Sequence, residues 1–288
     1  MSDITLTSSM RANLVSLQTT STLLGRTQER LSTGLKVNTA VDNPAAYFAA
    51  RGHNQRSDLL SGLKDNISEA IQTVKAADQG VKGVLSTVEA LRGVVTQARS
   101  ALNDSVNSGT TLSGLTIQYN ELIRQLNNIA GDSSYKGINF LSGTGQTLTV
   151  NFNENATTKL TMSGFDSSSS GLNLSGGVVG VNTAGTLTSG SVDSTGELDA
   201  MEARLNTAIA TLQTESSKLA ANLTILTTRQ SYLTDMINVL RDGATALTVA
   251  DTNEEGANLL ILQTRQQLGT TALSLSSQAA QSVLRLFG

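Results

Sequence analysis

Few residues in this sequence are of the types that perform chemistry. Its 288 residues include 1 His and no Cys, which excludes disulfides, thiolate nucleophiles and metal sites built from paired histidines. His53 lies among polar residues, and without a second ligand we interpret it as a solvated side chain. The acidic run 251–255 resembles the start of a calcium loop, but the twelfth position is Leu262, where such loops need a bidentate Glu. The sequence therefore predicts no catalytic residue, no cofactor and no metal site, and the chain is not expected to be an enzyme.

The composition favours thin helix-on-helix packing over a thick globular core. There are 5 Phe, 4 Tyr and no Trp, so small and branched aliphatic side chains must fill the interior. The formal net charge of −3 argues against nucleic acid as a partner. No apolar run approaches the roughly 20 residues of a membrane-spanning helix, so no membrane insertion is expected. The first residues also lack the basic and apolar regions of a secretory signal.

The strongest pattern is a heptad repeat in the first half of the chain. Its leading apolar residues are Leu60, Ile67, Val74, Val81, Val88 and Val95. A second stripe, also spaced by seven, contains Leu63, Ala70, Ala77, Val84, Leu91 and Ala98. Both core positions of the repeat are apolar, which predicts a long helix over about 60–102, followed by a further helix over about 113–130. The glycines of the long helix, Gly80, Gly83 and Gly93, are expected to weaken it slightly.

The second half repeats this pattern. A ladder of leucines spaced by seven consists of Leu205, Leu212, Leu219, Leu226, Leu233 and Leu240. Its companion stripe is apolar except at Ser216 and Gln230. The two long helices match in length, so we expect both ladders to pack inside the chain.

Two shorter stripes lie at the ends of the sequence. Met10, Leu17, Leu24 and Leu31 recur every seven residues in a predicted helix over about 4–33. A last helix, capped by Asp251, carries Ile261, Leu268 and Leu275 on one stripe and Leu286 on another. These terminal helices have little else to bury, so we expect them to contact other copies of the chain. Between the first two helices, Pro44 is expected to open a helix capped by Asp42 or Asn43.

The middle of the chain has a different composition. Residues 142–195 are rich in Ser, Thr and Gly, and 148–152 and 159–162 alternate like strands. We predict exposed, polar β-hairpins here, and expect deletion of 165–190 to be tolerated. The fold class is therefore mainly α. It is a long antiparallel coiled-coil helical bundle with a small β-hairpin region in the middle, and the chain termini pair as a coiled coil.

Several segments match one known family. Residues 30–46 resemble the N-terminal signature of bacterial flagellins, and 135–141 resemble the short motif that follows the third helix of that family. At the other end, 263–269, 273–284 and the closing Leu286-Phe287 are similar to the family's C-terminal signature. These motifs occur in the family's order and leave only the middle of the chain uncovered.

The resemblance implies a structural role. Flagellins are exported unfolded through the flagellar type III channel and polymerise into the extracellular flagellar filament. It implies an N-terminal inner-tube helix (1–35), two halves of a long-helix core (36–141 and 196–250), a variable exposed region (142–195) and a C-terminal inner-tube helix (251–288). The implied partners are further copies of the chain, hook-associated and cap proteins, the export machinery and an export chaperone on the C-terminal helix. Because of the same resemblance, Phe287 is also expected to contact other copies of the chain.

Three other readings stay open. A hook–filament junction protein shares both termini of the family in weaker form. An enzyme could be inserted in the middle, but 142–195 contains no His for the His-Glu-x-x-His site it would need. A cytoplasmic coiled-coil scaffold would share the heptads but not the terminal motifs.

Overall fold

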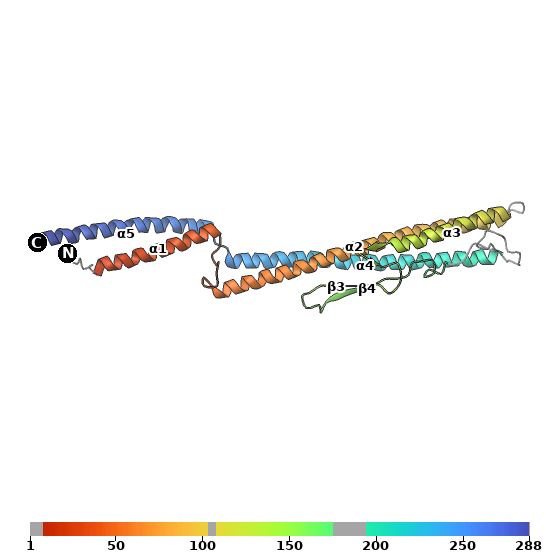
Figure 1. Ribbon diagram of the computed structural model, residues 1–288, viewed down its shortest axis with the longest axis horizontal. Coiled ribbons are helices and arrows are strands. Elements are labelled where there is room, and N and C mark those ends of the chain that lie inside the picture. Colours follow the sequence, from red (N-terminus) through yellow and green to blue (C-terminus); the bar gives the residue numbers. More distant parts are fainter. Residues whose placement is uncertain (1–7, 103–107, 175–193, 288) are drawn as a thin grey trace. The chain divides into compact units, whose positions relative to one another are not determined.

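The computed structural model describes residues 8–102, 108–174 and 194–287 (Figure 1). In these ranges the helices are α1 (Ser8–Thr33), α2 (Pro44–Leu102), α3 (Ser108–Asp132), α4 (Ser194–Thr248) and α5 (Thr252–Phe287). The strands are β1 (Ser134–Tyr135), β2 (Ile138–Asn139), β3 (Thr147–Asn151) and β4 (Lys159–Ser163). The chain divides into two compact units: a terminal unit, 1–57 with 238–288, and a central unit, 58–237. The mainly helical fold class is confirmed.

The long helix α2 begins earlier than its heptads. The Ala46 N–H donates to Asn43 Oδ1 at 3.1 Å, so Asn43 is the N-cap and Pro44 occupies the first helical position. Asp42 instead accepts hydrogen bonds from Asn38 and from both the N–H and the hydroxyl of Thr39, and these bonds lower the pKa of Asp42. The expected cap of α5 is present, because Asp251 Oδ1 accepts the Asn253 N–H at 2.8 Å.

The predicted ladders lie in the interior of the structure. All twelve leading heptad residues, from Leu60 to Val95 and from Leu205 to Leu240, are at most 8% exposed. The companion residues Ala70, Ala77, Val84, Leu91 and Ala98 are at most 3% exposed. The aliphatic seam that the sequence predicts therefore forms the core of the helical packing.

Both polar interruptions of the second ladder make hydrogen bonds to α2 within the central unit. Gln230 Nε2 donates to Ser68 Oγ at 2.7 Å, and Ser216 Oγ donates to Asp78 Oδ1 at 3.4 Å. A polar group in a helical seam favours the one register in which it finds its partner. These two pairs therefore specify how α2 and α4 align.

A two-stranded antiparallel hairpin lies beside these helices, with Thr149 opposite Thr161 and Val150 opposite Leu160. Its strands agree with the predicted segments within one residue at each end. Val150 and Met162 point inward, and Phe152 lies under the guanidinium of Arg229, 5.0 Å from the ring centroid. The short β1–β2 pair was not predicted from the sequence.

The segment after β4 is packed, contrary to the expectation of an exposed tip. Ser167 is fully buried and its hydroxyl donates to the Leu141 carbonyl at 3.1 Å, while Leu172 and Leu174 are 6% and 2% exposed. The Ser169 N–H donates to Asn127 Oδ1 at 2.8 Å. Deletion of 165–190 would remove these contacts, so that expectation is wrong for 165–174. The rest of the deletion, from residue 175 on, lies outside the described residues.

Tyr119 of α3 anchors the same segment. It is 1% exposed, its hydroxyl donates to the Leu174 carbonyl at 3.5 Å, and burial raises its pKa from 10.0 to about 12. The folded state therefore favours the neutral phenol. We expect the stabilisation that comes from keeping Tyr119 neutral to be complete below pH 10. It should be lost as the pH rises through about 12, which lowers the free energy of unfolding by roughly 2 kcal/mol. Chemical denaturation across this range checks it, and Tyr119→Phe should flatten the pH dependence.

Candidate assembly surface

The terminal unit pairs α1 with α5 in antiparallel fashion, so the start of α1 and the end of α5 lie at the same end of this pair (Figure 1). Leu17 packs on Gly269, and Arg30 bonds Glu255. Beyond the helices, the Lys36 and Val37 N–H groups donate to the Thr248 carbonyl at 2.7 and 3.1 Å, and the Ala250 N–H donates to the Gly34 carbonyl at 3.0 Å. The paired termini of the predicted fold class are therefore present within one chain.

The structure places most of the α1 stripe in this intrachain seam. Met10 is 6% exposed, and Leu17 and Leu24 are half-buried. The alternate seam positions are polar, with Thr20 and Thr27 at 9% and 6% exposure. Such a seam buries less apolar area per turn than one with leucine or valine at both positions. Leu31, at 39% exposure, is the least covered residue of the stripe.

Gly269 is the closest approach between the two terminal helices. A Cβ at this position would lie 2.6 Å from Leu17 Cδ2 and 3.0 Å from its Cγ. Glycine at this position lets Leu17 come this close, and a larger residue would force the leucine side chain to shift. The sequence motif contained Gly269 but gave no sign that it faces another helix.

An ion pair closes the seam near the start of α5. Arg30 Nη1 lies 2.8 Å from Glu255 Oε1, and the Glu255 side chain is 8% exposed. Arg30 is in the last turn of α1 and Glu255 is in the first turn of α5, so each charge also interacts favourably with the dipole of its own helix. The two opposite charges therefore attract each other across the seam when the terminal helices pair.

Reversing one charge tests this pairing. We expect Arg30→Glu to weaken the α1–α5 pair by about 3 kcal/mol, because it leaves Glu255 buried against a like charge. The double variant Arg30→Glu/Glu255→Arg should recover much of the loss. Amide hydrogen exchange in α1 measures it; equal exchange in the single and double variants would contradict the assignment.

The predicted stripe of α5 lies on a different face from the seam. Ile261, Leu268 and Leu275 are 50%, 65% and 62% exposed, while Glu255 and Leu262, spaced by seven with Gly269, turn inward. Exposed leucines repeated at heptad spacing are typical of a helix that has a further partner. Leu286 and Phe287 belong to α5, but their side chains lie outside the described part of the chain.

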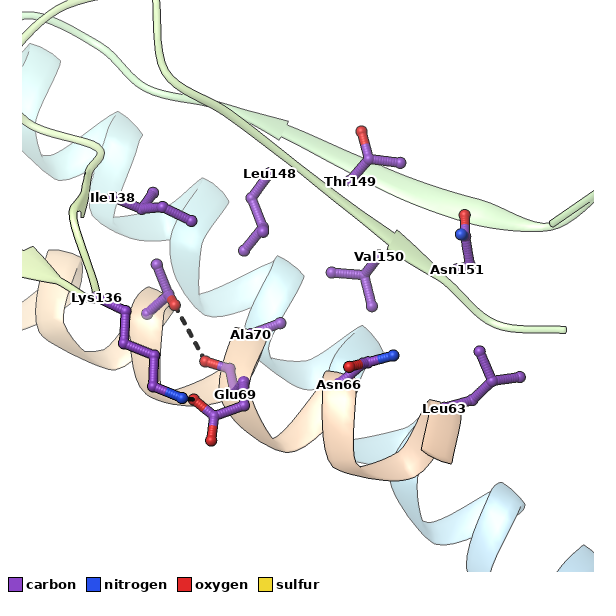
Figure 2. A pocket seen from close by; sticks show the side chains of 11 residues that line it. Leu63, Asn66, Glu69, Ala70, Lys136, Ile138, Leu148, Thr149, Val150 and Asn151 are labelled. Atoms are coloured by element: carbon purple, nitrogen blue, oxygen red, sulfur yellow. Dashed lines mark hydrogen bonds and ion pairs between the residues drawn. The ribbon is translucent and has the colours of Figure 1, made fainter. Parts of the chain in front are cut away.

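Figure 2 shows a cavity of about 280 Å³ in the central unit, between α2 and β3. Leu63 and Ala70 line it from α2, and Leu148 and Val150 line it from β3. At its edge Lys136 Nζ lies 2.7 Å from Glu69 Oε2, and this pair lowers the pKa of Glu69 and raises that of Lys136. The salt bridge connects the β1–β2 turn to α2.

Asn139 is a central structural residue that the sequence analysis did not identify. It is 8% exposed, and its amide nitrogen donates to the carbonyls of Ala130 and Gly131, each at 2.8 Å. Its Oδ1 accepts the Leu141 N–H, also at 2.8 Å. One side chain therefore caps the end of α3 and fixes the chain that follows it. The positive φ of Lys136 and Gly137, 49° and 81°, forms the turn that brings Asn139 back to the helix end.

Gly80 and Gly93 of α2 have opposite surroundings. A Cβ on Gly80 would lie 2.6 Å from Ser133 Cβ and 2.7 Å from Leu141 Cδ2, whereas one on Gly93 would meet nothing within 4 Å. We expect Gly80→Ala to lower the free energy of unfolding by about 1–3 kcal/mol and Gly93→Ala to raise it by up to about 1 kcal/mol. Urea denaturation of both variants checks this; the same sign for both would contradict it.

The described residues contain no group of three or more His, Asp or Glu side chains placed to hold a metal ion. Among the helices of those same ranges, none is both long and apolar enough to cross a membrane.

Comparison with known proteins decides the family. Residues 4–146 match the family model for the bacterial flagellin N-terminal helical region. The chain is 26% identical over 274 residues to flagellin FljO of Caulobacter vibrioides, which covers 95% of this chain and 94% of that protein. It is 27% identical over 296 residues to a flagellin of Brucella melitensis, covering 100% and 99%. The chain belongs to the bacterial flagellin family.

The resemblance inferred from the motifs is therefore confirmed, and both flagellins align along nearly their whole length. Among solved structures, a flagellar hook-associated protein from Vibrio parahaemolyticus has a TM-score of 0.57 at 11% identity, covering 72% of this chain and all of that one. That likeness shows a shared helical fold.

Proposed function

We propose that this chain is the structural subunit of a bacterial flagellar filament and performs no catalysis. Full-length similarity to flagellins supports this role. The observation that carries it is the exposed heptad stripe of α5, Ile261, Leu268 and Leu275, on a helix whose other face is already paired with α1. A stripe of this kind is buried when copies of the chain pack along one another, and repeated head-to-tail contacts of this kind give an open helical polymer.

The terminal pair supports assembly through its limited stability. Because polar Thr20 and Thr27 occupy the α1 seam, α1 and α5 gain little from pairing alone. Neighbouring copies would then supply the remaining burial, and helical order would increase on assembly. Met10, Leu17 and Leu24 hold the pair together in this scheme, while Leu31 and the α5 stripe contact the next copies.

Family membership also supports proposals about the export, the location and the partners of this chain. The chain would leave the cell unfolded through the flagellar type III channel, with an export chaperone on the C-terminal helix, and would act outside the cell. Hook-associated and cap proteins would meet it at the ends of the filament. A chain without Cys needs no disulfide exchange during such passage.

Seeded assembly tests the proposal. Purified chain with ammonium sulfate should form long tubes, visible by negative-stain electron microscopy, with a gain in helical circular dichroism. The fold likeness to a hook-associated protein makes a junction protein the second candidate. Failure to form tubes even on added filament seeds would favour that candidate.

A further inference from the structure

The outer edge of β3 carries backbone groups that no other strand pairs. On its inner edge, the chain after β3 continues the ladder, because the Phe152 N–H donates to the Thr158 carbonyl at 2.8 Å. Residues of an antiparallel pair alternately bond the partner strand and point away from it. By this alternation Thr147, Thr149 and Asn151 direct their N–H and C=O groups away from β4. Among the described residues, these backbone groups have no hydrogen-bond partner.

The cavity of about 280 Å³ runs along this outer edge. It is lined by four consecutive residues of β3, 148–151, and by none of the described residues of β4. Successive side chains of a strand point to opposite faces. In Figure 2, Leu148 and Val150 point toward α2, while Thr149 and Asn151 point away from it. Thr149 and Asn151 therefore line the cavity with their backbone.

One face of α2 forms the opposite wall of this groove. Its main lining residues recur every three or four positions, which places them on one side of the helix. They are Leu63, Asn66, Ala70 and Thr73. From the first to the last of them the helix rises about 15 Å, close to the roughly 17 Å of a five-residue strand. The groove is therefore as long as β3 and has the length of one further short strand.

The chemistry of the groove favours an uncharged, partly apolar chain. Leu63, Leu148 and Val150 supply aliphatic surface. The charged residues at its edge, Glu69 and Lys136, neutralise each other at 2.7 Å. Extended peptides bind where a free strand edge lies beside such a groove. Backbone hydrogen bonds then provide the affinity, and the groove accepts every second side chain.

We propose that the groove between β3 and α2 binds an extended, uncharged segment of another protein, which adds a strand to the outer edge of β3. Residues of the segment that bond β3 point their side chains away from α2, and the alternate residues place aliphatic side chains in the cavity. A second copy of the chain is a poorer source of this strand. Its longest described strands, β3 and β4, are already paired with each other.

A labelled peptide tests the site on the free, full-length chain. The probe is a fluorescein-labelled peptide with the alternating core Thr-Val-Thr-Val-Thr and one lysine at each end. Fluorescence anisotropy should show saturable binding. N-methylation of the threonines removes the donors that face β3, so it should abolish binding. N-methylation of the valines leaves those donors in place, so binding should persist.

Two opposed threonines provide a matched pair of variants. Thr149 and Thr161 face each other across the hairpin, and each directs its N–H to the outer edge of its own strand. Proline at either position keeps the bonds between β3 and β4 and removes one outer donor. Thr149→Pro should weaken peptide binding about tenfold or more, whereas Thr161→Pro should leave it unchanged. Both variants should melt at the same temperature.

A second pair of variants leaves the strands untouched. Asn66 and Gln72 are both exposed on α2, but of the two only Asn66 lines the groove. Asn66→Trp should fill the groove and weaken peptide binding about tenfold or more. Gln72→Trp should bind the peptide like the unmodified chain.

Equal affinities of the two proline variants, or of the two tryptophan variants, would overturn the assignment. Absence of saturable binding up to about 1 mM peptide would also overturn it. If the free chain dimerises in sedimentation and Thr149→Pro abolishes the dimer, a second copy occupies the edge and the assignment is wrong. None of these measurements involves polymerisation, so their outcome is independent of the filament role.

Discussion

Leu268→Glu should abolish filament formation and leave the helical core folded. Leu268 is 65% exposed at the centre of the α5 stripe, so a single chain loses almost no packing when it is replaced. In the filament the same position would carry an unpaired carboxylate into an apolar contact, which costs several kcal/mol at every subunit. Sedimentation after addition of ammonium sulfate measures the loss directly.

Gln263→Glu is the matched control for that experiment. Gln263 is also exposed on α5, but it lies about 140° around the helix from Leu268. The Gln263→Glu variant should assemble normally, whereas Leu275→Glu should fail to assemble, like Leu268→Glu. Filaments of normal length from Leu268→Glu would show that the α5 stripe is not an assembly contact. A lower melting temperature for that variant would instead mean that Leu268 packs within the chain.

Asn139→Ala should markedly lower the free energy of unfolding. It removes hydrogen bonds to the carbonyls of Ala130 and Gly131 and to the Leu141 N–H, all in a site with 8% exposure. Buried backbone groups left without partners cost about 1–3 kcal/mol each, and partial relaxation should leave a net loss of about 3 kcal/mol. Urea denaturation followed by circular dichroism measures the change.

Asn128→Ala serves as the control for this substitution. Asn128 belongs to the same helix α3 but is exposed, so its removal should change the free energy of unfolding by less than about 0.5 kcal/mol. Asn139→Asp retains the acceptor for Leu141 but loses both donors, so we expect it to be destabilised as well. An unfolding free energy for Asn139→Ala within 1 kcal/mol of the unmodified chain would contradict the capping role.

Periodicity predicted the core of this chain well, because a helix buries the same face every seven residues. Leu226 and Val88 are fully buried where the heptads place them. The same reasoning could not separate the two faces of α5. Leu262, Leu268 and Leu275 are all apolar residues of one helix, and the contacts of Gly269 with Leu17 and of Glu255 with Arg30 show which face meets α1.

The sequence analysis failed mainly for polar residues that are buried in the structure. Residues 165–174 are rich in Ser and Gly, a composition typical of exposed loops, yet Ser167 is buried because its hydroxyl bonds the Leu141 carbonyl. Asn139 is buried for a similar reason. A side chain that satisfies backbone groups of a distant segment leaves no periodic signal, so such sites appear only once the fold is known.

The most direct test of the central claim is seeded polymerisation of the purified chain in ammonium sulfate, followed by sedimentation and negative-stain electron microscopy. Long tubes with a gain in helical circular dichroism are predicted, because burial of the exposed α5 stripe drives assembly and orders the terminal helices. A soluble monomer with no tubes and no added helix, even in the presence of filament seeds, would contradict the filament role.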